Sequence, residues 1–222
     1  MNEIIQAVAI YALPVIFAIT LHEAAHAYAA KYFGDNTAFA AGRMSINPIR
    51  HIDPFGTILL PIVLYAATMH TSMPFVFGYA KPVPVDFANL RNPKKQMAWV
   101  ALAGPASNFA MAFGWLLLSI FLTVFGINET YPHKVAQAGI FVNILMFVFN
   151  LVPIPPLDGG RVMTSMLPGR FAYQFAKLEP FGFFIVLALL YFNILNYWFI
   201  PTMTATHWLL KLLASPFTFL LS

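Results

Sequence analysis

The chain has 222 residues, of which 60% are hydrophobic and only 9% are charged. Soluble globular domains are about one quarter charged, so this composition excludes an ordinary soluble protein and indicates a surface that faces lipid. The net charge of +4 does not indicate nucleic-acid binding, because the basic residues lie in short loops between apolar segments, as in membrane proteins. The chain has no cysteine, which excludes disulfides and thiolate metal sites.

Five apolar segments predict transmembrane helices, because each is near the ~20 residues that cross ~30 Å of hydrocarbon. They cover residues 4–30, 97–125, 135–157, 181–200 and 202–221. The first lacks a basic n-region and is longer than a signal peptide, so we expect it to be retained as a helix. The last contains Lys211 and could either return across the bilayer or lie at its surface. We therefore expect a mainly α-helical, polytopic bundle of about five to six transmembrane helices.

Two polar stretches, 34–53 and 78–96, are rich in Pro, Gly, Asn and basic residues and do not read as helices. The parts at 42–51 and 74–86 have short extended character, and the alternating prolines of "KPVPV" are typical of an edge strand. Basic clusters flank 53–77 on both sides, so the positive-inside rule places both of its ends in the cytoplasm. We expect this segment to be re-entrant, and a plain short crossing is the alternative.

The stretch "AITLHEAAHAYAA" places His22, Glu23 and His26 inside the first apolar segment, where ionisable groups are costly and are functional candidates. Residues four apart share a helix face, so the two imidazoles are suited to one metal ion. Glu23 lies about 100° around the helix, from where its carboxylate can reach a water on the metal without being a ligand. This H-E-x-x-H arrangement predicts a zinc peptidase centre. The alternative is a His–Glu polar cluster that holds helices together.

A catalytic zinc usually has three protein ligands and one open position. The candidate for the third ligand is Asp158 in "FNLVPIPPLDGGRV", which follows three prolines and precedes Gly159 and Gly160. Such irregular backbone at membrane depth is tolerated only where protein or a water-filled cavity surrounds it. The alternative is that Asp158 caps a loop. N/O ligands predict zinc, but they also suit other divalent ions.

Three motifs together resemble the site-2 protease family of intramembrane zinc metalloproteases. They are "HEAAH" at 22–26, "AGPASN" at 103–108 and "NLVPIPPLDGGR" at 150–161, and their order and separation also match. The resemblance extends from about residue 15 to 165. The block "GYAKPVPVDFANLRNPKKQMAWVALAGPASN" is similar to the compact branch of the family, which lacks an inserted PDZ domain.

The resemblance implies one Zn²⁺ per chain, bound by His22, His26 and Asp158, with Glu23 as the catalytic base. It implies that Asn150 contacts the substrate or stabilises the oxyanion.

The family also has a small membrane-associated β-sheet after the first motif, and residues 42–48 and 74–85 are the candidates for it. An unwound substrate could pair with its edge by β-augmentation, with Gly78, Lys81 and Val83 as contacts. The small residues of "AGPASN" predict close helix packing. The alternative to a role in packing alone is that Asn108 braces the "LDGG" turn or the sheet.

The implied activity is hydrolysis of peptide bonds within or near transmembrane segments of membrane-protein substrates, as in regulated intramembrane proteolysis. We expect a single domain over 1–222, with a catalytic core at about 4–165 and accessory helices at about 178–221. We expect a multi-pass protein of the cell membrane whose active site lies nearer the cytoplasmic side. Its partners would be a transmembrane protein or peptide and the lipid bilayer, with no nucleic acid, and the oligomeric state stays open.

Two functions of other classes compete with the protease. A metal-binding membrane scaffold would present a substrate without cutting it. An ion transporter would line its path with His and Asp, and it would favour internal repeats and paired broken helices. The sequence contains no visible repeat.

Overall fold

The computed structural model describes residues 2–59, 63 and 81–218, and the elements assigned in this part of the chain are helices. The long helices are α1 (Asn2–Phe33), α4 (Pro93–Val124), α5 (Thr130–Asn150) and α9 (Asn196–Thr218). The shorter α-helices are α2 (Thr37–Ala40), α6 (Asp158–Met166), α7 (Gly169–Ala176) and α8 (Glu179–Tyr191). Between α2 and α4, the described residues include the short elements η1 (Pro48–Arg50), η2 (Pro54–Leu59) and η3 (Phe87–Asn89).

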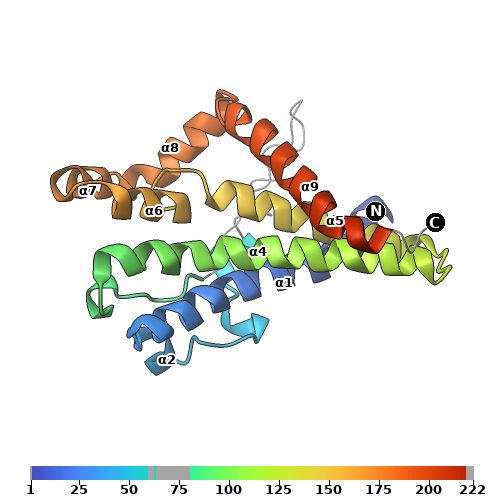
Figure 1. Cartoon of the computed structure of the whole chain (residues 1–222), viewed down its shortest axis with the longest axis horizontal. Coiled ribbons are helices and arrows are strands. Elements are labelled where there is room, and N and C mark those ends of the chain that lie inside the picture. The colour runs from blue at the N-terminus through green and yellow to red at the C-terminus, as the bar shows by residue number, and fades with distance from the viewer. Residues whose placement is uncertain (1, 60–62, 64–80, 219–222) are drawn as a thin grey trace.

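Helices α1, α4 and α5 pack against one another and form the centre of the molecule. In Figure 1, α4 crosses the whole view between α1 and α6. The buried face of α1 consists largely of alanine: Ala18, Ala24, Ala27 and Ala30. Small side chains allow helix backbones to approach closely in lipid, where apolar bulk alone gives no preference for another helix over an acyl chain.

By length and composition, three helices could cross a membrane: Ile5–Phe33 within α1, α4 and α5. A fourth crossing is possible if α7 and α8, which meet at an angle of 68°, form one broken span. The expected five to six transmembrane helices are therefore too many for the described residues. The 13 residues of α8 rise only about 20 Å, and α9 is long enough but carries polar residues such as His207 and Lys211.

The predicted β-sheet is also wrong, because the described residues contain no strand. Residues 42–47 form turns and irregular chain, Pro48 begins η1, and 81–85 is not paired in any ladder. The physical reason lies in "KPVPV". Pro82 and Pro84 have no N–H to donate, and the N–H of Val83 is bonded to the side chain of Glu23. Residues 74–80, and most of the predicted re-entrant segment 53–77, lie outside the described residues.

A buried carboxylate holds the extended segment after residue 81 against the end of α1. Asp35 is fully buried and accepts hydrogen bonds from the backbone and hydroxyl of Thr37, from the backbone N–H of Asp86 at 2.9 Å and from the amide of Asn89 at 3.3 Å. Burial alone would raise the pKa of Asp35, but these donors hold that pKa below its ordinary value.

The loop that leads from α5 into α6 packs tightly from both sides. A Cβ at Gly159 or Gly160 would collide with the backbone of residues 151–155, and a Cβ on Gly182 of α8 would collide with the carbonyl oxygen of Pro155. Helix α6 in turn packs on α4. Helices α4 and α8 therefore fix the position of Asp158, the first residue of α6.

Candidate metal centre

The two histidines of "HEAAH" lie one turn apart on the buried face of α1, which makes their imidazoles neighbours. Their Nε2 atoms are 3.1 Å apart. Gly104 of α4 faces both rings, and a Cβ there would come within 2.6 Å of Cε1 of His22 and even closer to His26. Glycine at position 104 is therefore the residue that leaves room for the pair.

Asp158 completes a three-atom cluster with these histidines. Its Oδ2 lies 3.2 Å from Nε2 of His22 and 3.3 Å from Nε2 of His26, and all three residues are buried. The structure thus brings together three residues that the sequence analysis selected as zinc ligands, two from α1 and one from α6.

Hydrogen bonds on the far side of the imidazoles direct their free nitrogens into this cluster. Nδ1 of His26 lies 2.7 Å from the carbonyl oxygen of Val100. Because a carbonyl only accepts, Nδ1 carries the hydrogen, and a neutral ring then has its lone pair on Nε2. Nδ1 of His22 lies 2.6 Å from Oδ1 of Asn108, which assigns that ring in the same way.

Three lone-pair atoms therefore face one another across a buried space. Oδ2 of Asp158 has no hydrogen-bond donor among the described residues. Such an arrangement is repulsive unless a metal cation or a proton lies between the atoms. Zinc bonds of ~2.0–2.1 Å in a tetrahedron separate neighbouring ligand atoms by about 3.3 Å. The observed separations of 3.1, 3.2 and 3.3 Å fit that geometry.

Glu23, the expected base, is half-buried on α1 and its ligand-type atoms are not part of the three-residue cluster. Its Oε2 accepts a hydrogen bond of 2.7 Å from the backbone N–H of Val83. The carboxylate is thus held by the segment after residue 81, and within the part of the chain that the structure describes no second hydrogen bond to it is found.

The other expected substrate contacts differ in their placement. Asn150 is the last residue of α5, and its Nδ2 donates to the carbonyl oxygen of Met146 in the same helix at 3.0 Å. Lys81 is exposed, and its N–H donates to the carbonyl oxygen of His51. Val83 is buried against α1 and bonds Glu23. Gly78 lies outside the described residues.

Sequence reasoning missed several residues around the histidines. Asn108 contacts His22 rather than the "LDGG" turn or a sheet, and Asn143 and Val100 were not singled out. Gly104 was expected only to permit close helix packing, and its place beside the two rings was not predicted. A signal existed for the two asparagines, because a polar amide inside an apolar span needs a partner.

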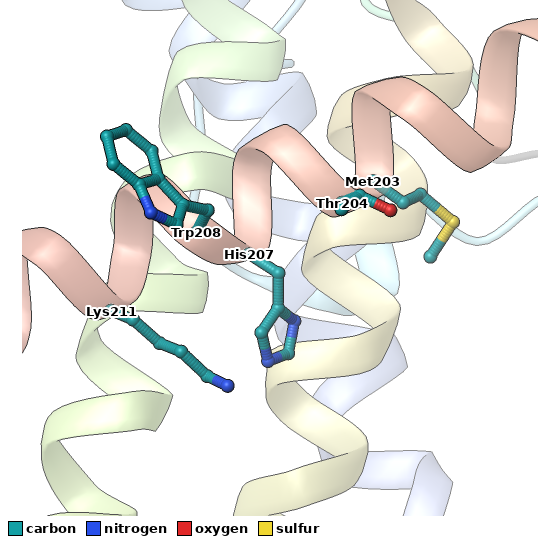
Figure 2. Close-up of a pocket in the computed structure, with 5 residues that line it drawn as sticks. All are labelled: Met203, Thr204, His207, Trp208 and Lys211. Carbon is teal, nitrogen blue, oxygen red and sulfur yellow. The ribbon is translucent and has the colours of Figure 1, made fainter.

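A surface pocket on α9 is separate from this centre. Figure 2 shows its lining residues, which all come from α9: Met203, Thr204, His207, Trp208 and Lys211. None of them belongs to the buried cluster of His22, His26 and Asp158. The pocket therefore adds no group to the candidate metal centre.

Comparison with known proteins gives a consistent family assignment. The model of the family described as "Peptidase family M50" matches residues 127–193. "Putative zinc metalloprotease YwhC" of Bacillus subtilis is 36% identical, over 80% of this chain and 78% of its own length. "Putative zinc metalloprotease Rip2" of Mycolicibacterium smegmatis is 30% identical, over 83% of this chain and 67% of its own. No solved structure matches.

Proposed function

Because this chain belongs to peptidase family M50, the site-2 protease family, we propose that it hydrolyses peptide bonds within or near the transmembrane segments of other membrane proteins. The chain is a zinc metalloprotease and a membrane protein. Its substrate class, the roles of its residues and the side of the membrane on which it acts are the subject of the proposal.

The observation that carries the proposal is the buried triangle of lone-pair atoms contributed by His22, His26 and Asp158. These residues would hold one zinc ion and leave the fourth position open, as in catalytic zinc sites. A zinc ion supplies Lewis acidity, both to the scissile carbonyl and to the water that attacks it.

Glu23 is the proposed general base, which takes a proton from the attacking water and passes it to the leaving amine. Two features support this role. It follows a proposed ligand directly on α1, and the N–H of Val83 holds one of its oxygens, so that the other can face the water. A carboxylate fixed in this way does not have to reorganise when the reaction begins.

Asn150 is the proposed donor to the developing oxyanion. Its amide has two N–H bonds, of which one is occupied by the carbonyl of Met146. The second can serve the substrate, and a donor of this kind contributes roughly 2.7–4 kcal/mol to transition-state stabilisation where it has been measured.

The active site is proposed to lie nearer the cytoplasmic side of the bilayer. Basic residues follow both metal-binding segments: Lys31, Arg43 and Arg50 come after the histidines, and Arg161 comes after Asp158. The positive-inside rule favours the cytoplasm for such loops. We also propose that residues 1–222 act as one domain, since α8 packs against the loop that carries Asp158.

The experiment compares wild type with Glu23→Gln, His22→Ala and His207→Ala, each purified in detergent. Bound zinc is measured by elemental analysis, and cleavage is measured on a panel of fusion proteins that each contain one transmembrane segment. We expect one zinc per chain in wild type and Glu23→Gln, with cleavage by wild type and not by Glu23→Gln. His22→Ala should lose the metal.

His207→Ala is the matched control, because His207 lies on α9 outside the cluster; it should retain zinc and cleavage. Zinc without cleavage of any substrate by wild type would favour the metal-binding scaffold. Absence of zinc from wild type would overturn the proposed site.

A further inference from the structure

A chain of buried amides extends from His22 through all three central helices. Oδ1 of Asn108 on α4 lies 2.6 Å from Nδ1 of His22 on α1. Nδ2 of Asn108 lies 3.1 Å from Oδ1 of Asn143 on α5. Both asparagines are fully buried. Two uncharged amides in series at this depth are not required for helix formation, so their arrangement calls for a role.

The orientation of the Asn108 amide is fixed by a backbone group. Its Nδ2 lies 3.2 Å from the carbonyl oxygen of Ala18, which can only accept a hydrogen bond. If the amide were reversed, its oxygen would face that carbonyl and would also meet Oδ1 of Asn143. Oδ1 of Asn108 must therefore face His22.

Asn143 is oriented in the same manner. Its Nδ2 lies 2.9 Å from the carbonyl oxygen of Gly139 in its own helix. This leaves its Oδ1 directed at Nδ2 of Asn108. Backbone carbonyls thus fix both amides in one direction, and the chain of hydrogen bonds ends in an acceptor beside His22.

We propose that Asn108, supported by Asn143, is a positioning residue that holds His22 in the tautomer with hydrogen on Nδ1, so that Nε2 presents its lone pair to zinc. The inference rests on the proposed metal site. Partners of this kind orient the imidazole and raise the affinity of its other nitrogen for the metal, and their removal typically lowers metal affinity 10–100-fold.

The two histidines are fixed by different means. His26 relies on the carbonyl of Val100, a backbone group that no substitution of that residue deletes. His22 relies on side chains, so position 108 is the place where the chain itself can adjust zinc affinity. The same amides also connect three helices, and their role in positioning must be separated from a role in packing alone.

The experiment measures zinc affinity by competition with a chelator, and the absorption spectrum of the cobalt-substituted protein, in purified full-length chain. Asn108→Ala removes the acceptor and should bind zinc roughly 10–100-fold more weakly than wild type, with an altered cobalt spectrum. Asn108→Asp retains an acceptor beside Nδ1 but places a second oxygen against the carbonyl of Ala18 and Oδ1 of Asn143, so it should bind zinc more tightly than Asn108→Ala while unfolding at a lower temperature than wild type. Asn143→Ala removes only the supporting amide and should fall between wild type and Asn108→Ala.

The matched control is Trp198→Phe, which deletes an interhelical hydrogen bond of 3.0 Å between α9 and the carbonyl oxygen of Val148 in α5. If Asn108 only joins helices, Asn108→Ala should resemble this control, with a lower melting temperature and unchanged zinc affinity. That outcome would overturn the inference and leave the metal site intact.

If Asn108→Ala does not fold, the test uses Asn143→Ala, which removes the amide that supports Asn108. An unchanged zinc affinity in Asn143→Ala would then overturn the inference. A wild-type chain that binds no zinc would overturn the proposed site and this inference with it. The two failures are therefore distinguishable.

Discussion

The backbone N–H of Val83 donates to Oε2 of Glu23 over 2.7 Å, although the two residues are 60 positions apart in the sequence. Val83 stands between two prolines, neither of which has an N–H. From Pro82 to Pro84 the only backbone N–H is that of Val83, and it donates to the carboxylate of Glu23, which lies beside the proposed ligand His22 in the sequence. The segment "KPVPV", which was predicted to be an edge strand, instead holds the side chain of Glu23.

Replacing Val83 with proline should lower the rate of cleavage roughly tenfold or more while zinc remains bound. The substitution deletes the donor, and a hydrogen bond to a charged group is worth about 1.5–3 kcal/mol. Two neighbouring prolines already keep the chain extended, so the backbone path should change little. Val83→Ala keeps the N–H and serves as the control, and equal rates for the two variants would contradict the role of this bond.

Gly104→Ala should remove most of the bound zinc. The new methyl group would lie within 2.6 Å of His22 and closer still to His26, so the imidazoles must move apart. Gly114→Ala is the matched control on the same helix, since a Cβ there meets nothing within 4 Å. Elemental analysis should find zinc near one per chain in the control and well below that in Gly104→Ala. One zinc per chain in both variants would contradict the prediction, because it would mean that the imidazoles can move away from the new methyl group and still bind the metal.

Gly182→Ala should destabilise the protein by about 1–3 kcal/mol through overpacking. A methyl group at this position collides with the backbone of Pro155, in the loop that leads to Asp158. Thermal unfolding should therefore occur at a lower temperature, and zinc affinity should fall with it. Gly169→Ala, at a position with open space around it, is the control. If unfolding is unchanged but zinc affinity falls, the effect is on the loop alone.

Acid should destabilise wild type through Asp35. Its pKa is lower in the folded chain than in the unfolded chain, so its contribution to stability is present above the unfolded pKa, near 4. That contribution is lost as the pH falls through the lowered folded value. Asp35→Asn should be less stable than wild type at pH 7, and the difference in melting temperature should shrink on acidification below about pH 4. A constant difference would contradict the assignment.

Local sequence pattern was sufficient for the part of the site that lies on one helix. The spacing of His22 and His26 dictates their shared face, whatever surrounds them. Asp158 was selected for two reasons: it lies in a proline- and glycine-rich segment at the end of an apolar run, and its carboxylate could supply the third zinc ligand. The structure brings these residues together, and their roles in binding and catalysis stay a prediction.

The residues that contact the histidines could not be predicted from the local sequence pattern. Asn108, Asn143 and Val100 contact their partners through the packing of α4 and α5 on α1, which no periodicity encodes. The error in the sheet has a similar origin, because extended character in "KPVPV" was taken for pairing while its donor belonged to a side chain. The apolar composition of 181–200 predicted a transmembrane helix, but α8 ends at Tyr191 and is too short to cross the bilayer. Asn193, with φ of 58°, is not in a helical conformation and lies just after that end.

The division of the metal cluster between the first helix and α6 has a consequence for biogenesis. His22 and His26 leave the ribosome early, and Asp158 follows only after α4 and α5 have been synthesised. A chain that ends before Asp158 holds the two imidazoles without the third ligand, and one that ends before α4 also lacks Val100 and Asn108, which orient them. The proposed zinc site is therefore incomplete until synthesis has reached the last third of the chain.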